Sequence, residues 1–304
     1  NKGLHWIIEN QLIYQNRFGD HDVTFLIGAS RDRAFGEGIG GTISNIPVDN
    51  IEDASLLFAT PVETQAFYGF EYDSRVASTY SRLNYNYKEK YIISGVLRRD
   101  GSSKFGKNNL YGTFPSVSAG WVISEESFIP TNKNINFLKL RASWGLNGND
   151  RIGDFLFIPT VTTGSNYTFG ADNNLIIGAT PLILANPDLR WEETSQLNIG
   201  LDMVLFKNVK LTAEYFLKKT DGILQTFRIP DFVGFQSPIG NIGKIENEGF
   251  ELELGYGKSI NGWNFDFSGN ISYNDNIVTF IAPDRDFNPG QFFSPQGLEI
   301  TRTS

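Results

Sequence analysis

Residues Gln196–Phe206 read QLNIGLDMVLF, and apolar and polar side chains alternate along the whole run. After the short connector Lys207–Asn208 the alternation resumes in VKLTAEYFLK, residues 209–218. Successive side chains of a strand point to opposite faces, so each run has one apolar face and one polar face. Two such runs joined by so short a connector predict a β-hairpin.

A second hairpin follows the same pattern, with strands at Phe250–Tyr256 and Trp263–Tyr273. The connector between them contains Asn261-Gly262, a pair that supplies the positive φ angles of a tight hairpin turn. Six further runs alternate less cleanly, at Leu4–Gln15, Val23–Arg31, Val76–Tyr87, Tyr91–Arg99, Phe114–Ile123 and Leu138–Leu146. The sequence therefore predicts ten strands, with ends uncertain by about two to four residues.

The connectors between these runs alternate short and long along the chain. Short ones are expected at Asn16–His21, Lys88–Lys90, Ser124–Asn136, Lys207–Asn208 and Lys258–Gly262. Long ones are expected at Asp32–Arg75, Asp100–Thr113, Asn147–Leu189 and Gly222–Ile242. An antiparallel up-and-down transmembrane β-barrel sorts its connectors this way, with short turns on the periplasmic side and long loops outside.

The five tryptophans lie near predicted strand ends, which is where aromatic residues collect at a membrane interface. Trp121 and Trp263 lie at short connectors, together with Tyr14, Tyr87 and Tyr91, whereas the long-connector ends hold Trp6, Trp144 and Trp191. Each tryptophan taken alone is better explained as a core residue of a soluble β protein. Taken together, they favour two aromatic girdles in contact with outer-membrane lipid.

Composition excludes several other classes. No run of about 18 apolar residues exists, which excludes a helical membrane span. The net charge is -8 and is not gathered into a basic patch, so nucleic acid is not an expected partner. With no cysteine there is no disulfide framework and no thiolate metal site.

Catalytic and metal-binding candidates are poor, and we expect neither an enzyme nor a cofactor. The only histidines are His5 and His21, too few for a histidine-based triad or metal site. Acidic stretches at residues 172–174 and 284–288 lack the ligand spacing of a calcium loop.

If the barrel encloses water, the polar positions of the clearest strands line its lumen, where they would meet hydroxyl-rich solutes and disfavour polyanions. The candidates are Gln196, Asn198, Asp202, Glu214, Glu251, Glu253, Asp266 and Asn270. Aromatic residues in the long loops are candidates for stacking on a ligand or for contact with a lid protein, although loop packing also explains them. They are Tyr167, Phe169, Phe227, Phe232, Phe235, Phe292 and Phe293.

Several ordered segments resemble the SusC/RagA group of TonB-linked outer-membrane proteins. They are RRDGSSKF (98–105), YGTFPS (111–116), GW (120–121), SEESF (124–128), LKLRASWG (138–145), GN (148–149), NPDLRWE (186–192) and GKIENEGFE (243–251). The resemblance covers residues 75 to 280.

The resemblance implies a barrel of 22 strands, of which residues 1–304 would supply about ten as part of one domain. It also implies an N-terminal plug and a TonB-contacting segment, both expected outside this stretch, which reads as an internal fragment. The family imports nutrients across the bacterial outer membrane with a SusD-like surface lipoprotein, commonly glycan breakdown products and less often peptides. The substrate here is therefore expected to be an oligosaccharide or a peptide.

Two alternatives share part of this pattern. A passive outer-membrane porin has the same strands and turns. A soluble carbohydrate-binding or adhesive β protein would also carry aromatic residues in its loops.

Overall fold

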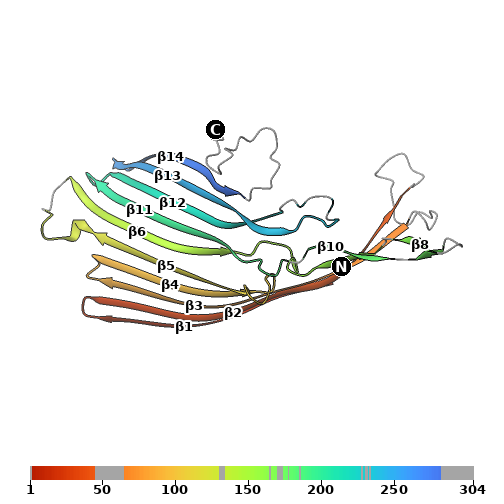
Figure 1. Ribbon diagram of the computed structural model, residues 1–304. Helices are drawn as coiled ribbons and strands as arrows, with labels where there is room; N and C mark the ends of the chain where they lie inside the picture. Colours follow the sequence, from red (N-terminus) through yellow and green to blue (C-terminus); the bar gives the residue numbers. More distant parts are fainter. Residues whose placement is uncertain are drawn as a thin grey trace.

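The computed structural model describes residues 2–44, 65–129, 134–163, 166–169, 174–176, 178–184, 186–226, 229, 232 and 234–281. Within these residues ten long strands form one antiparallel sheet in the order β1-β2-β3-β4-β5-β6-β11-β12-β13-β14 (Figure 1). The long strands are β1 (Lys2–Phe18), β2 (His21–Ile43), β3 (Gln65–Tyr87), β4 (Tyr91–Ser102), β5 (Tyr111–Val122), β6 (Ile135–Asn149), β11 (Glu192–Leu205), β12 (Val209–Thr226), β13 (Ile239–Ile260) and β14 (Trp263–Ile281).

Chain neighbours are sheet neighbours throughout, so the all-β, up-and-down arrangement predicted from the alternation is confirmed. Figure 1 shows the hairpin turns at one end of the sheet and the longer connections at the other, called here the turn end and the loop end. The sheet is open in the described residues, with β1 and β14 at its two edges.

The tight turns have local causes. Asn261 and Gly262 both have positive φ, 51° and 85°, as the Asn-Gly pair predicted. Lys88 and Glu89 adopt φ of 54° and 56° without glycine, and Ile123–Glu125 forms the short 3-10 helix η3 in the longest turn-end connector. Positive φ at both central residues matches the twist of the flanking strands, which fixes the register of these two hairpins.

The predicted long connector Asp32–Arg75 is shorter than expected because both of its flanking strands, β2 and β3, continue into it. β2 extends twelve residues beyond Arg31, and Gln65–Tyr87 begins well before the predicted Val76, with an unbroken register from His21↔Tyr87 to Ile43↔Gln65. Beyond Arg31 the sequence is rich in glycine and charge, so hydrophobic alternation disappears while backbone pairing goes on. Alternation reports the band where one face is apolar; it does not report where a strand ends.

The connection between β6 and β11 contains two small hairpins, β7 (Thr160–Thr163) with β10 (Ala179–Ile183), and β8 (Tyr167–Phe169) with β9 (Asn174–Ile176). A small core lies at the loop end, where Phe105, Phe114, Leu189 and Trp191 pack together. None of the described residues forms a helix long and apolar enough to cross a membrane.

Candidate functional site

The eight polar residues predicted to line a lumen share one face of the sheet, called here the polar face. On β11, Gln196, Asn198 and Asp202 alternate with the apolar residues. Cross-strand partners lie on the same side of a sheet, and the register carries this face onward through Glu214↔Glu251 and Glu253↔Asn270. The opposite side, called the apolar face, carries Ile199, Leu201 and their cross-strand partners.

Arg141 on β6 joins two of these predicted residues. Its Nε lies 3.3 Å from Oδ2 of Asp202, and its Nη2 lies 2.5 Å from Oε2 of Glu214. Gly200, on the strand between them, leaves the space, since a Cβ there would lie 2.5 Å from Cζ of Arg141. The ion pairs thus tie β6, β11 and β12 together on the polar face.

Arg141 was not among the residues predicted to line the lumen, although its position on the polar face follows from the sequence pattern. Within the strand LKLRASWG it alternates with Leu140 and Ala142, and it faces Gly200 across the β6–β11 pair. Only the register, which no alternation pattern supplies, shows that its two acidic partners lie within reach.

A row of neutral polar side chains crosses the middle of the same face. Asn198 accepts a hydrogen bond from Gln196 (3.0 Å) and donates one to Ser143 (3.3 Å). Two strands further on, Ser94 donates to Asn84 (2.7 Å). The row supplies donors and acceptors of the kind that a hydroxyl-rich solute or a peptide backbone uses.

A second charged network lies on the polar face of the first strands. Arg98 donates to Oδ2 of Asp100 (2.7 Å) and to Oγ of Ser78 (2.8 Å), and its guanidinium lies 5.4 Å from the ring centre of Tyr80. The Tyr80 hydroxyl in turn donates to Glu9. None of these residues was among the predicted ones, because their strands alternate less cleanly.

Near the turn end, Glu253 and Asp266 line a hollow of about 820 Å³ together with Lys210. Glu251 and Asn270 lie exposed on the same face. Lys139 and Lys218 also belong to this face by register, opposite Asp202 and Gln196. The polar face therefore carries both positive and negative side chains. The excess of negative charge that was expected to disfavour polyanions does not extend over the whole face.

Four of the five tryptophans lie at apolar-face positions. Trp121 and Trp263 stand beside the turns, with Trp263 73 % exposed. Trp144 is half-exposed, and its Nε1 donates to Ser195 at 3.1 Å. Trp6 pairs with Arg33 near the loop end.

Trp191 departs from the predicted girdle. It is only 7 % exposed, and its ring lies 5.0 Å from Phe105 and 5.4 Å from Phe114 between ring centres. Pairing between β5 and β6 stops at Ser116↔Gly145, so the strands separate towards the loop end and the aromatic cluster packs there. Trp191 therefore packs inside the protein, which a strand-end position alone does not reveal.

The predicted loop aromatics do not form one group in the described residues. Tyr167 and Phe232 are exposed, and Phe235 is half-buried, on two different connections. Phe169 ends β8. Phe227, Phe292 and Phe293 lie outside the described residues.

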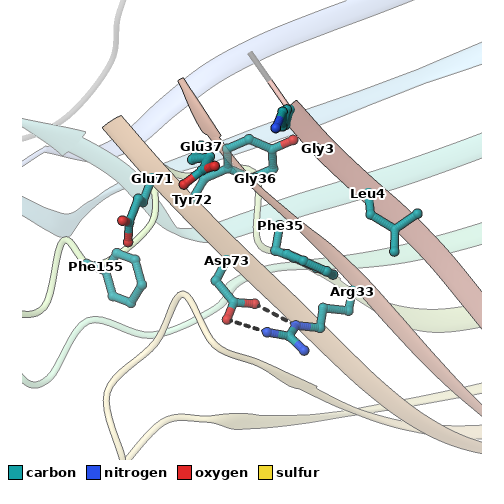
Figure 2. Close-up of a pocket in the computed structure, with 11 residues that line it drawn as sticks. Gly3, Leu4, Arg33, Phe35, Gly36, Glu37, Glu71, Tyr72, Asp73 and Phe155 are labelled. Atoms are coloured by element: carbon teal, nitrogen blue, oxygen red, sulfur yellow. Dashed lines mark hydrogen bonds and ion pairs between the residues drawn. The ribbon is translucent and has the colours of Figure 1, made fainter. Parts of the chain in front are cut away.

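A hollow of about 620 Å³ at the loop end was not predicted (Figure 2). Glu37, Glu71 and Tyr72 line it from β2 and β3, and Phe155, from the β6–β11 connection, points toward Glu71. Phe155 holds a φ of 61°, unusual for a residue with a side chain. An aromatic ring and carboxylates beside one opening are suited to contact a polar ligand that approaches from the loop end.

No group of three or more metal-ligating side chains occurs in the part of the chain that the structure describes. The polar face thus offers binding and passage, with charged and neutral hydrogen-bonding groups spread over many strands.

Comparison with known proteins covers nearly the whole chain. The family model described as TonB dependent receptor-like, beta-barrel matches residues 6–296. TonB-dependent receptor P39 of Formosa agariphila is 37 % identical over 307 residues, covering 96 % of this chain and 28 % of the relative. TonB-dependent receptor SusC of Bacteroides thetaiotaomicron is 32 % identical over 232 residues, covering 75 % of this chain and 23 % of SusC.

Among solved structures, the RagAB peptide importer in its closed-closed state matches with a TM-score of 0.77 and 25 % identity, over 96 % of this chain and 32 % of the importer chain. The outer membrane transporter YddB from Escherichia coli matches with a TM-score of 0.59 at 12 % identity, over 90 % of this chain and 34 % of YddB, which is a likeness of fold alone. The chain spans about a quarter to a third of the length of these relatives.

Proposed function

The chain belongs to the TonB-dependent receptor-like β-barrel family, and from that premise we propose that it supplies part of the wall of a TonB-dependent importer of oligosaccharides or peptides. The family places it in the bacterial outer membrane as an integral β-barrel protein. Family membership over residues 6–296 is the observation that carries the proposal. The relatives are receptors, and the proposal includes no catalytic role.

The two faces of the sheet support this role. In a closed barrel the apolar face meets lipid and the polar face lines the lumen. Lumen groups such as Arg141 and Asn198 then replace part of a solute's hydration shell during passage. Because positive and negative side chains share the face, neutral polar solutes suit it best.

The partners are proposed from the relatives. SusC is described as TonB-dependent, and RagAB as a peptide importer. We propose a SusD-like surface lipoprotein seated over the loop end, with TonB acting through a part of the protein outside these residues. The whole chain, 1–304, belongs in this proposal to one barrel domain of 22 strands.

The test uses the full-length protein in its native host. Cells receive a mixture of defined oligosaccharides and peptides, and depletion of each solute is measured with TonB present and deleted. We expect uptake of one solute class to fall to the level of a strain that lacks the importer. Uptake that persists without TonB would contradict the proposal and would favour a passive porin.

A second measurement separates these two outcomes physically. Full-length protein in planar bilayers is expected to show no steady conductance, because an energised importer stays closed without TonB. A steady open conductance would identify a porin. Recovery of the full-length protein in the soluble fraction would contradict both membrane proposals.

A further inference from the structure

Four arginines gather on the apolar face of neighbouring strands at the loop end. Arg31 and Arg33 lie on β2, Arg75 on β3 and Arg99 on β4. Arg33 and Arg75 are direct cross-strand partners, while Arg31 faces Ala77 and Arg99 faces Thr79 on β3. The arginine cluster therefore lies on the loop-end side of the apolar residues that would contact the acyl chains of the membrane lipids.

The carboxylates nearby do not neutralise the arginine cluster. Asp73 accepts two hydrogen bonds from Arg33, each 3.0 Å long, and is also bonded by Arg75. Asp32 also borders the hollow described below, but its Oδ1 lies 2.8 Å from Nε2 of His5, on the polar face. Glu37 and Glu71 face each other further towards the loop end. Four guanidinium groups thus share one carboxylate in the cluster, and Arg31 and Arg99 are exposed.

A hollow of about 300 Å³ opens among these side chains. Arg31, Arg33 and Arg75 line it, with Trp6 and Tyr111. Its lining also includes Ala77 and Gly101, cross-strand partners whose small side chains leave the space. Several guanidinium groups around one small hollow match the geometry of a phosphate, which accepts paired N–H donors.

A longer groove of about 620 Å³ continues from this hollow down the apolar face. Short side chains at Ala29, Thr79 and Ser81 lie between the larger Ile27 and Leu97. Arg99 lines the groove and also stacks over Tyr111 of the hollow, 4.6 Å from the ring centre. The hollow and the groove therefore form one continuous surface, cationic towards the loop end and apolar below.

We propose that this surface binds the phosphorylated glycolipid of the outer leaflet, with a phosphate in the arginine hollow and an acyl chain in the groove. Charge complementarity and position on the lipid-contacting face select this occupant. The site rests on the proposed orientation in the membrane, with the loop end outside, and not on the transported solute. Its failure would therefore leave the import proposal untouched.

The loop end of β12 and β13, near the opposite edge of the sheet, carries a different arrangement of charges, which shows that the arginine cluster is local. On the same face of β12 and β13, Lys219 pairs with Glu246 at 2.8 Å and Lys244 with Asp221 at 2.7 Å. Glu248 accepts a hydrogen bond from Tyr215 there. Arg190 also lies 3.5 Å from Asp221, so each of these three cations has an acidic partner, and this second rim offers phosphate no comparable site.

The experiment uses full-length protein purified in mild detergent, with native mass spectrometry of bound lipid A. The double variant Arg31→Gln with Arg99→Gln removes two cations that do not hold Asp73. We expect about tenfold weaker lipid A binding, since each basic side chain near a membrane surface adds to the attraction of anionic lipid. The matched control, Lys219→Gln with Lys244→Gln, is expected to bind lipid A as the parent does.

A second variant tests the shape of the site. Ala77→Leu fills the hollow while every charge stays in place, and it is expected to weaken lipid A binding as well. Unchanged binding by Ala77→Leu, or equal loss in the Lys219/Lys244 control, would overturn the proposal in favour of a diffuse charged rim.

The lipid probes separate the sources of phosphate. Phosphorylated lipid A is expected to bind, and dephosphorylated lipid A is expected to be lost during detergent exchange. Equal retention of phosphatidylglycerol would contradict the glycolipid assignment. Displacement of lipid A by millimolar inorganic phosphate alone would contradict the contribution of the groove.

Discussion

The two faces of the ten-stranded sheet are built from alternate residues of the same strands, yet their side chains have different interaction partners. On the polar face, Arg141, Asp202 and Glu214 satisfy one another within the protein. On the apolar face, Ile199 and Ile271 remain 45 % and 61 % exposed. The polar side chains find partners within the protein or in water, whereas the apolar face needs lipid as its partner.

This difference shows where the stability of such a sheet is located. Backbone hydrogen bonds are common to both faces, so they hold the strands together without distinguishing the sides. Ion pairs and hydrogen bonds on the polar face link side chains of adjacent strands. The exposed apolar side chains of the other face are stable only when they contact lipid. Substitutions at adjacent residues of one strand should therefore have very different effects.

The largest effect is expected at the loop-end aromatic cluster, whose side chains are buried and face neither lipid nor the lumen. Trp191→Ala removes a buried indole between Phe105 and Phe114 and should lower the free energy of unfolding by about 3–5 kcal/mol. Urea unfolding of the full-length protein in detergent measures the loss. Trp263→Ala is the control, because that side chain is 73 % exposed and should cost far less. Equal losses would mean that both tryptophans meet the same surroundings.

A large difference is also expected between two neighbouring residues of β11, which lie on opposite faces of the sheet. Ile199→Arg places a charge on the lipid-contacting band and should destabilise the barrel by about 2–4 kcal/mol. Asn198→Arg, one residue away, points into the lumen and should be tolerated. Folded yield in outer membranes, read by heat-modifiable mobility, reports both variants. Similar loss in the two would disprove the assignment of the faces.

A smaller effect is expected within the polar face. Arg141→Met leaves Asp202 and Glu214 without their shared cation, which should cost about 1–3 kcal/mol because unpaired polar groups lose a charged hydrogen bond. Adding Asp202→Asn and Glu214→Gln to Arg141→Met should recover part of the loss. A mutant cycle measured by urea unfolding, with Arg141→Met as one change and the combined Asp202→Asn and Glu214→Gln as the other, gives the coupling energy, and strict additivity would show that the observed ion pairs do not act together.

The smallest effect is expected at the turn end, at Glu126. Glu126 accepts hydrogen bonds from Tyr91 (2.5 Å) and from Trp121 (3.0 Å), and these bonds lower the pKa of its carboxyl group below the usual value. A carboxylate with a lowered pKa stabilises the fold above its unfolded-state pKa, and this contribution disappears as acid protonates it.

Glu126→Gln should therefore reduce thermal stability at neutral pH and make no difference once the pH falls below the lowered pKa. Melting of full-length protein from neutral to acid pH measures this. Glu125→Gln, at an exposed neighbour, is the control and should follow the parent at every pH. A deficit in Glu126→Gln that persisted in acid would assign the residue a role independent of its charge.

Much of the fold could be predicted because alternation is a local property. Leu197, Ile199 and Leu201 identify the apolar side of β11 independently of the surrounding structure, and Asn261-Gly262 predicts the hairpin turn in which it lies. The polar positions from Gln196 to Asn270 fell on one face for the same reason. The continuation of β2 to Ile43 was missed, because backbone pairing there proceeds without an apolar face.

The sequence by itself determined which residues share a side, how the strands follow one another and which family the segments resemble. Only the tertiary structure decided that Arg141 holds Asp202 and Glu214, that Trp191 is buried and that three of the four clustered arginines line one hollow. A strand's own periodicity sets the direction of each side chain. Which residues a side chain contacts depends on the register of the strands and on where adjacent strands separate. Both are set by residues that lie far apart in the chain.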